Sequence, residues 1–385
     1  MKPRDYQLDA LNGNDDHRGI VPTFESTQRT LLVMATGLGK TNVFCWWLQQ
    51  MAARHMVIAH REELIWQAQR RLEQICNWPV GVEMADWRTS EEDLYTPKKT
   101  VVSTVQTQIA GRGDDRRMKN FDPLSFSALV VDECHRAAAK SYRSVIDWYC
   151  ANPNLKCLGV TATPNRHDEK ALGEIFDEVA YCMDYLDAAR LGWLVPVHTR
   201  AARVEALDLT AVGVAGGEFK TEELQAICKR DKVIYQTALV MRELPPAKTL
   251  TFVVGVEQAE ALCGVLRQEG IAAEWVCGKT PKPDRRAMLE RFKTGETSTI
   301  VNVGVLTEGF DEPSIERIVM ARPTLSDGLY RQMMGRGTRT LEGVVDDLDE
   351  RDDRLSAIAA SGKPRLEVID LVGNAQLGRQ PITAA

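Results

Sequence analysis

The stretch Met34-Ala35-Thr36-Gly37-Leu38-Gly39-Lys40-Thr41 decides the fold that we expect for this chain. An apolar run at residues 31–33 precedes it and predicts a buried strand, and a helix-compatible run follows at residues 42–53. A strand, a glycine-containing loop, a Lys-Thr pair and a helix form the layout of a phosphate-binding loop. The glycines let successive N–H groups turn toward an anion, and the helix N-terminus adds its positive end.

Two side chains of this loop carry the expected chemistry. Lys40 is predicted to place its ammonium at the β- and γ-phosphates of a nucleotide, and the Thr41 hydroxyl is predicted to ligate Mg²⁺. The other loop residues expected at the nucleotide are Thr36, Gly37, Leu38 and Gly39. The general pattern has a glycine six positions before the lysine, where Met34 stands. The alternative is a glycine turn that merely precedes Lys-Thr, and the flanking strand and helix favour phosphate binding.

Composition restricts the class of protein. The 385 residues are enough for two domains, and 44% hydrophobic and 26% charged residues are typical of globular chains. The nine cysteines are scattered, which argues against a disulfide framework and a zinc site. The net charge of −6 does not indicate a nucleic-acid partner, although a basic cleft can lie on an acidic body. Without a long apolar stretch or a signal core, we expect a cytoplasmic protein with no membrane contact.

Apolar runs alternate with helical patterns along the rest of the chain. Buried strands are predicted at residues 56–59, 100–104, 128–131 and 157–160, and again at 249–254, 273–276, 299–303, 317–320 and 366–370. This alternation predicts doubly wound parallel sheets, whose ligands gather at the carboxyl ends of the strands. We expect a first domain at residues 1–200, a connector at 201–246 and a second domain at 247–385. The second domain has no phosphate loop, which indicates a nucleotide shared at an interface.

Asp132 and Glu133 follow the strand predicted at residues 128–131. Behind a phosphate loop, the first carboxylate is expected to hold Mg²⁺ and the second to orient and deprotonate the attacking water. The alternative is a pair of solvated acids at a strand end.

A helix is predicted at residues 327–339, with Ser326 as its N-cap. Gln332, Arg336 and Arg339 then share one face, and two guanidiniums suit the charge that develops on a transferring phosphoryl group. The alternative is an exposed basic helix face. Glycines inside this helix weaken it, so we expect them to approach another surface closely.

The motif Asp132-Glu133-Cys134-His135 resembles a DEAD/DEAH-type box, and the chain as a whole resembles a superfamily 2 helicase. The resemblance is strongest to the branch shared by type I and III restriction motors, fork-remodelling phage helicases and the promoter-opening repair helicase. Met34 fits the loop of that branch. The resemblance implies that Arg4 and Gln7 read adenine.

Further motifs carry the same resemblance. Residues 332–339 resemble the sixth motif, which assigns Gln332, Arg336 and Arg339 to catalysis. The resemblance assigns His135, Thr161 and Thr163 to coupling, and Gly309 and Asp311 of the fifth motif to the nucleotide. It assigns His60, Arg61, Ser103, Thr104, Gln106 and Thr307 to a nucleic-acid strand. Hydroxyl, amide and backbone N–H groups suit phosphate oxygens, and Arg61 and Lys279 are expected to make salt-dependent contacts. The charged loop at residues 111–119 lies either over a duplex or in solvent.

The resemblance implies an α/β fold of two RecA-like doubly wound domains in tandem, with ATP and Mg²⁺ in the cleft between them. It implies an ATP-dependent DNA helicase or translocase. An RNA helicase, the ATPase motor of a restriction or nuclease assembly, and a clamp that binds nucleic acid without using ATP are the alternatives. DNA rather than RNA rests on the resemblance alone. The small size indicates a phage or mobile-element protein, or one that needs a protein partner.

Overall fold

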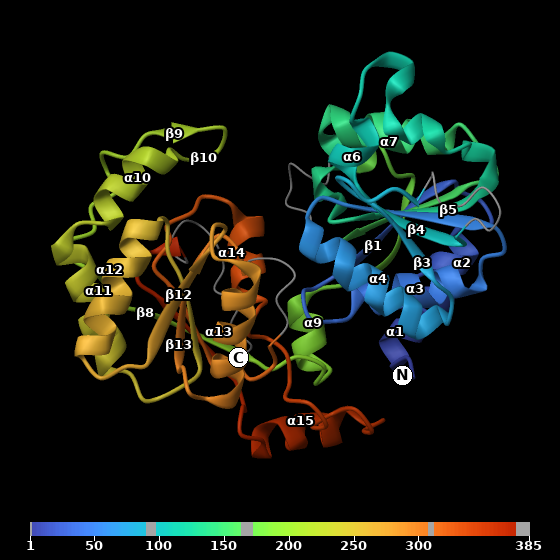
Figure 1. Ribbon diagram of the computed structural model, residues 1–385. Coiled ribbons are helices and arrows are strands. Elements are labelled where there is room, and N and C mark those ends of the chain that lie inside the picture. The colour runs from blue at the N-terminus through green and yellow to red at the C-terminus, as the bar shows by residue number, and fades with distance from the viewer. Residues whose placement is uncertain (1, 90–97, 163–171, 307–311, 375–385) are drawn as a thin grey trace. The chain divides into compact units, whose positions relative to one another are not determined.

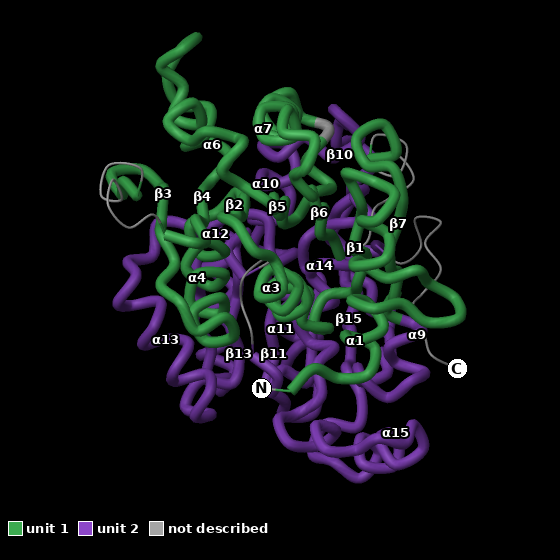
Figure 2. Tube along the Cα trace, turned by 90° about the vertical axis from the view of Figure 1, so that its right-hand side faces the viewer, with its two compact units in different colours: residues 1–185 green, residues 186–385 purple. Residues whose placement is uncertain are grey.

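The computed structural model describes residues 2–89, 98–162, 172–306 and 312–374. The chain divides into two compact units, Met1–Tyr185 and Leu186–Ala385 (Figures 1 and 2). Within the described ranges, none of the helices combines the length and the apolar character that crossing a membrane requires.

The first unit contains a sheet that, over the described residues, has seven parallel strands in the order β3-β4-β2-β5-β6-β1-β7 (Figure 2). Its strands are β1 (Arg29–Met34), β2 (Arg54–Ala59), β3 (Val80–Glu83), β4 (Thr100–Thr104), β5 (Phe126–Asp132), β6 (Lys156–Thr161) and β7 (Glu178–Met183). Its helices are α1 (Asp5–Asn12), α2 (Ile20–Thr23), α3 (Lys40–Gln50), α4 (Glu62–Cys76), α6 (Val105–Ile109) and α7 (Lys140–Cys150), and α9 (Tyr185–Arg190) follows.

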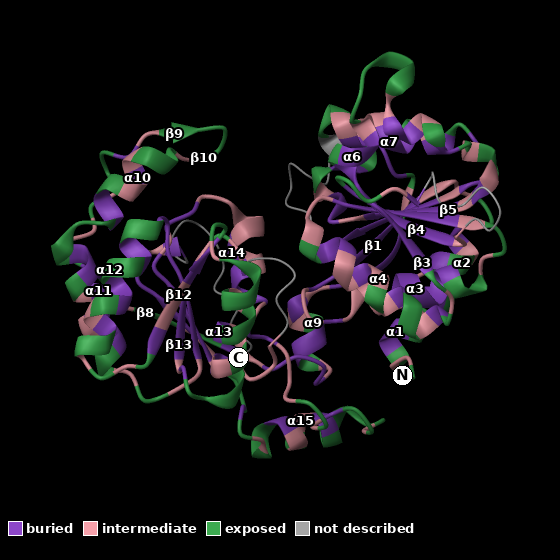
Figure 3. Cartoon of the chain, in the orientation of Figure 1, coloured by how far each residue is buried: buried purple, intermediate pink, exposed green. Residues whose placement is uncertain are grey.

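Helices cover the faces of this sheet, which explains why its central strands are apolar almost without interruption. Leu129 and Val131 of β5 are fully buried in a cluster with Val145 and Ile146 of α7. Figure 3 shows the strands of the sheet buried and the outer faces of the helices exposed. The predicted parallel, doubly wound architecture is therefore confirmed for this unit.

The second unit contains a sheet of six parallel strands over its described residues, in the order β12-β13-β11-β14-β15-β8. Its strands are β8 (Val197–Ala201), β11 (Thr249–Phe252), β12 (Ala273–Cys277), β13 (Thr299–Val303), β14 (Arg317–Met320) and β15 (Leu366–Asp370), and β9 (Val214–Ala215) and β10 (Glu218–Phe219) form a separate hairpin. Its helices are α10 (Thr221–Cys228), α11 (Asp231–Glu243), α12 (Val256–Gln268), α13 (Lys282–Thr294), α14 (Asp327–Met334) and α15 (Arg351–Ala360). The prediction of a second parallel sheet is confirmed.

The segment expected as a connector belongs to the second unit. β8 pairs in parallel with β15, and Val233 and Ala238 of α11 lie in one apolar cluster with Leu262 of α12. The chain divides after Tyr185, and the boundary expected at residue 200 stays a prediction. The partner of β8 lies more than 160 residues further along the chain, and such long-range pairing leaves no local signal in the sequence.

Candidate active site

The phosphate loop lies between β1 and α3 in the first unit. β1 ends at Met34 and α3 begins at Lys40, whereas the sequence predicted a strand at residues 31–33 and a helix at 42–53, so the predicted order of strand, loop and helix is confirmed with shifted bounds. Gly37 and Gly39 have φ angles of +97° and +75°, in the region that favours glycine. The Lys40 ammonium donates a hydrogen bond to the Met34 carbonyl oxygen at 3.1 Å. Its side chain therefore reaches back across the loop whose N–H groups would receive a phosphate.

Helix α1 contacts the phosphate loop through Tyr6 and Gln7. The Tyr6 hydroxyl and the Gln7 Nε2 each donate to the Leu38 carbonyl oxygen at 3.0 Å. The Gln7 Oε1 accepts from the Arg4 backbone N–H at 3.0 Å, which caps the helix start. A Cβ added at Gly39 would lie 2.8 Å from Gln7 Nε2, the flexible end of that side chain, so the φ of +75° rather than this contact favours glycine there. Of the two residues predicted to read adenine, Gln7 therefore lies beside the loop, and Arg4 stands at the start of the same helix.

The carboxylates Asp132 and Glu133 stand at the end of β5. Asp132 Oδ1 accepts a hydrogen bond from the Glu133 backbone N–H at 3.0 Å. Glu133 has φ +51°, a region that few non-glycine residues adopt, so the chain turns sharply there. His135 Nδ1 lies 3.4 Å from Glu133 Oε2 and 3.5 Å from Thr161 Oγ1. His135 thus connects the acidic pair to the end of β6, while its role in coupling stays a prediction.

The strand order brings the loop and the carboxylates to one edge of the sheet. β1 and β5 both pair in parallel with β6. Their carboxyl ends are therefore about 10 Å apart, at about 4.8 Å per strand. Carboxylate and hydroxyl oxygens, such as those of Asp132 and Thr41, are the ligands that Mg²⁺ prefers. An anion-binding loop beside hard oxygen ligands fits a nucleoside triphosphate with magnesium.

Two hydroxyls predicted to contact nucleic acid are buried instead. Ser103 Oγ donates to the Glu83 carbonyl oxygen at 2.7 Å, and its residue has no exposed surface. Thr104 Oγ1 accepts from the Thr107 backbone N–H at 3.2 Å and caps α6. These hydroxyls therefore bind backbone groups of β3 and α6, which differs from the expected direct contact with a phosphate.

The other residues predicted to contact a nucleic-acid strand lie nearer to the protein surface. Gln106 is exposed, and its Nε2 donates to the His60 carbonyl oxygen at 3.4 Å. Arg61 Nε donates to the His60 ring at 3.2 Å. Lys279 is exposed in the turn after β12. Four predicted residues lie outside the described residues: Thr163, Thr307, Gly309 and Asp311.

The helix predicted at residues 327–339 is shorter than expected. Ser326 Oγ accepts from the Leu329 backbone N–H at 3.2 Å and caps α14, as predicted. However, α14 ends at Met334. A Cβ added at Gly337 would overlap the Leu366 side chain of β15, so the close approach that was expected of glycines inside the helix occurs at a glycine beyond its end.

The shorter helix changes the arrangement of the arginines. Gln332 lies on α14, whereas Arg336 and Arg339 follow it in the chain, so the predicted common helical face is wrong. Arg339 instead forms an antiparallel bridge with Leu194. Both arginines are half-buried. The chain leaves the helix because Gly337 packs against β15, a contact that local helix propensity does not report.

A buried network that sequence reasoning missed holds the start of α14. The Glu218 carboxylate on β10 accepts hydrogen bonds from the Leu325 backbone N–H at 2.8 Å and from the Thr324 hydroxyl. Burial alone would raise the pKa of Glu218, but these hydrogen bonds lower it below its ordinary value. Asn374 accepts from the Thr324 N–H and donates to the Arg322 carbonyl oxygen, both at 3.0 Å. No motif marks these residues, because their partners lie 50 to 108 residues away.

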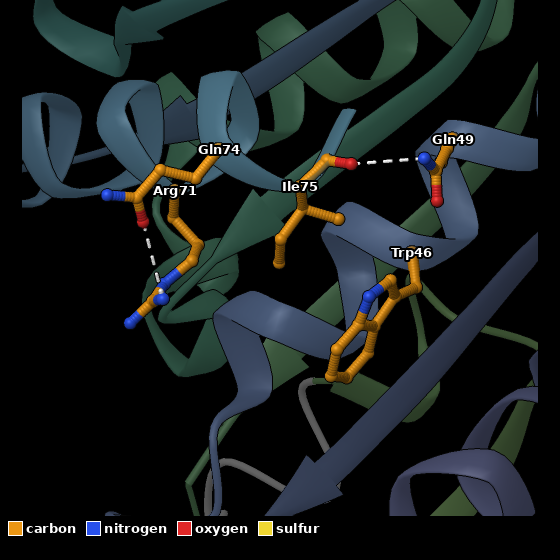
Figure 4. A pocket seen from close by; sticks show the side chains of 5 residues that line it. All are labelled: Trp46, Gln49, Arg71, Gln74 and Ile75. Carbon is orange, nitrogen blue, oxygen red and sulfur yellow. Dashed lines mark hydrogen bonds between the residues drawn. The ribbon is translucent and has the colours of Figure 1, made fainter. Parts of the chain in front are cut away.

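A pocket of about 400 Å³ lies between α3 and α4 (Figure 4). Gln49 Nε2 donates to the Ile75 carbonyl oxygen at 3.0 Å across it. Gln49 is nine residues beyond Lys40 on α3, which is about 13 Å along the helix axis. This pocket is therefore separate from the phosphate loop.

Two family models match the chain in order. The model described as "Type III restriction enzyme, res subunit" matches residues 1–166, and the model described as "Helicase conserved C-terminal domain" matches residues 229–340. The first match includes the phosphate loop and the acidic pair, and the second includes α14 and both arginines.

Known proteins resemble the chain over most of its length. The Saccharomyces cerevisiae protein "Putative ATP-dependent helicase IRC3" is 31% identical over 356 residues, 87% of this chain and 49% of that protein. The Escherichia coli "Type I restriction enzyme EcoAI endonuclease subunit" is 24% identical over 389 residues, 92% of this chain and 45% of that protein. The chain thus spans about half the length of these relatives.

A solved structure shares the fold. The "ATP-dependent Type ISP restriction-modification enzyme LlaBIII bound to DNA" has a TM-score of 0.67 at 17% identity, covering 96% of this chain and 27% of that chain. Because the restriction res-subunit model and the helicase carboxy-terminal model match this chain in order, and a putative ATP-dependent helicase is 31% identical over 87% of it, this protein belongs to the superfamily 2 helicases, as its motifs predicted.

Proposed function

We propose that this chain is a nucleic-acid-stimulated ATPase that moves along, remodels or unwinds duplex or forked DNA. The observation that carries the proposal is the phosphate loop itself. Lys40 spans it, and Gln7 and Tyr6 hold its Leu38 carbonyl, while Asp132 stands at the same edge of the sheet.

The described residues have distinct tasks in this proposal. Lys40 and the loop N–H groups bind phosphate oxygens, and Gln7 and Arg4 recognise the base. Thr41 and Asp132 hold Mg²⁺. Glu133 orients the attacking water and accepts its proton. ATP, when bound, supplies the phosphoanhydride bond whose hydrolysis drives movement.

Arg336 and Arg339 are proposed to neutralise the negative charge that develops on the transferring phosphoryl group. Nucleotide binding and hydrolysis would then favour different arrangements of the two units, and each arrangement would hold the strand differently. Both guanidiniums are half-buried, and the backbone at Arg339 is held by its bridge to Leu194 and by the hydrogen bond from Lys363, which supports this role, since a fixed donor is more effective than a mobile one.

The proposed polymer is DNA, because relatives of this chain include restriction-enzyme subunits and the LlaBIII structure is bound to DNA. Gln106, Arg61 and His60 are proposed to contact the strand backbone from the carboxyl ends of β4 and β2, and Lys279 from the second unit. RNA is the alternative.

Phosphate release tests this proposal. It is measured with ATP alone and with single-stranded DNA, forked DNA or RNA of equal length. We expect DNA to stimulate release most, with Lys40→Ala abolishing it and Lys232→Ala, at an exposed position on α11, leaving it unchanged. Undiminished ATP turnover by Lys40→Ala would refute the proposed nucleotide site. Stimulation by RNA alone would favour an RNA helicase. Binding of nucleic acid without ATP hydrolysis would favour a clamp that does not use ATP.

A second candidate is the motor of a restriction or nuclease assembly. The match to the restriction res-subunit model and the similarity to a type I restriction enzyme subunit favour it. The chain alone would then displace a triplex-forming oligonucleotide from DNA in the presence of ATP without cutting that DNA. Cleavage by the chain alone would contradict this candidate.

A further inference from the structure

Trp87 is an exposed tryptophan on a well-bonded turn. Its exposed fraction is 58%, although tryptophan is highly buried on average. The turn follows β3, and Met84 and Trp87 exchange two backbone hydrogen bonds, at 3.2 and 2.8 Å. A large apolar ring that the fold presents to solvent is a common anchor in binding sites.

A buried ion pair holds this turn. Arg117 donates to Glu83 Oε1 at 2.8 Å, to the Ala85 carbonyl oxygen at 2.6 Å and to the Trp87 carbonyl oxygen at 2.8 Å. Glu83 Oε2 accepts from the Thr89 backbone N–H at 2.7 Å. The charged loop at residues 111–119 was expected over a duplex or in solvent, and for Arg117 both expectations are wrong because Glu83 lies beneath it.

The turn also contains backbone strain. Ala85 has φ +49°, a conformation that residues with a side chain adopt only where the surrounding structure enforces it. Arg117 supplies that constraint by binding the Ala85 carbonyl oxygen. The buried Arg117–Glu83 pair and the unfavourable φ angle of Ala85 thus both belong to the turn that exposes Trp87. Such a costly arrangement favours a function for the exposed ring.

The ring lies at a pocket of suitable chemistry. Trp66 of α4 meets Trp87 edge to face, with ring centroids 5.3 Å apart at 80°. The pocket has a volume of about 500 Å³, and its lining includes Arg88, Lys98 and Asp86. Among the lining residues that the structure describes, two cations stand beside one carboxylate, and the aromatic walls favour a planar ligand.

The Trp87 turn lies on the same edge of the sheet as the residues proposed to contact a nucleic-acid strand. Glu83 pairs with Ser103 across β3 and β4, and Ala59 pairs with Thr104 across β2 and β4. The segments after β3, β4 and β2 therefore lie in that order along one edge of the sheet (Figure 2). A strand bound at Gln106 would reach the Trp87 turn at the outermost position of this edge.

We propose that Trp87 stacks on a base of a bound single strand, with the neighbouring cations at its phosphates. This inference rests on the proposed binding of a polynucleotide. Stacking on an aromatic ring tolerates any base, so Trp87 adds affinity without sequence preference. The contact also distinguishes single strands from duplexes, whose bases are already stacked on one another.

Fluorescence anisotropy with a labelled oligo-dT and an abasic oligomer of equal length tests the inference. We expect Trp87→Ala to raise the Kd for oligo-dT about tenfold and Trp87→Phe to retain most of the affinity. Leu124→Ala, which alters another exposed apolar residue, is the control and leaves the Kd unchanged. ATP hydrolysis without nucleic acid stays the same in Trp87→Ala.

The abasic oligomer separates stacking from a structural effect. The wild type should bind it less tightly than oligo-dT, whereas Trp87→Ala should lose little further affinity on it. Equal Kd values for wild type and Trp87→Ala on oligo-dT would overturn the inference and leave the helicase proposal intact. A wild type that binds neither DNA nor RNA would overturn both.

Discussion

The Lys363 ammonium donates a hydrogen bond to the Arg339 carbonyl oxygen at 2.7 Å. It also donates to the Pro313 carbonyl oxygen at 2.6 Å, and the residue is 2% exposed. Lys363 therefore connects the segment at residues 336–339, which carries Arg336 and Arg339, to Pro313, which follows the fifth motif. Burial lowers the pKa of Lys363 to about 7.

This pKa makes stability depend on pH. The folded value of about 7 lies below the ordinary 10.5, so the folded chain binds fewer protons than the unfolded chain between these values. The contribution of Lys363 to stability therefore increases as pH rises through that window. We expect the free energy of unfolding of the wild type, relative to Lys363→Met, to increase between about pH 7 and about pH 10 in urea titrations. A difference that stays constant with pH would contradict the shift, and exposed Lys232→Met should show a constant one.

Arg339→Ala should lower kcat for ATP hydrolysis by about 10³ and leave nucleotide affinity nearly unchanged, because the guanidinium acts on charge that develops during the reaction. Arg331→Ala is the matched control, since Arg331 lies on α14 and pairs with Asp327 at 2.7 Å. Steady-state kinetics of both variants measure the effect. A loss confined to KM would contradict the role.

Gln7→Ala should raise the KM for ATP by about tenfold, corresponding to about one lost hydrogen bond. It should also reduce the preference for ATP over GTP. Tyr6→Phe removes the other hydrogen bond to the Leu38 carbonyl without altering a base contact, so it should weaken both nucleotides alike. Equal preference in wild type and Gln7→Ala would show that Gln7 supports the loop alone.

Arg117→Met should lower the free energy of unfolding by about 3–5 kcal/mol, because it leaves the Glu83 carboxylate buried without its cation. The double variant Glu83→Gln/Arg117→Met removes both charges and should recover part of the loss. Urea titrations measure each step. A double variant as unstable as the sum of the single variants would contradict the coupling of the two charges.

Local patterns predicted most strands of both sheets. The strands at Thr100–Thr104, Thr299–Val303, Arg317–Met320 and Leu366–Asp370 match the predicted bounds. Buried parallel strands form continuous apolar runs, so they are visible without any knowledge of their neighbours. The strand β3 was missed, because it has only four residues and its pairing with β4 rather than its composition makes it a strand.

The segment at residues 326–339, which includes Arg336 and Arg339, was predicted only in part. Its cap at Ser326 is a local device and was predicted, but its end is decided by the contact of Gly337 with Leu366. Glu218 and Lys363 were missed for the same reason, since each is an ordinary charged residue until its distant partners surround it.

The sequence by itself determined the phosphate loop, the acidic pair and the alternation of strands and helices, because each depends on residues a few positions apart. Tertiary structure alone decided that Ser103 and Thr104 face inward, that Arg117 is buried against Glu83 and that Trp87 is displayed. These features depend on which segments meet across the sheet, and burial and pairing between distant residues have no signature in local spacing.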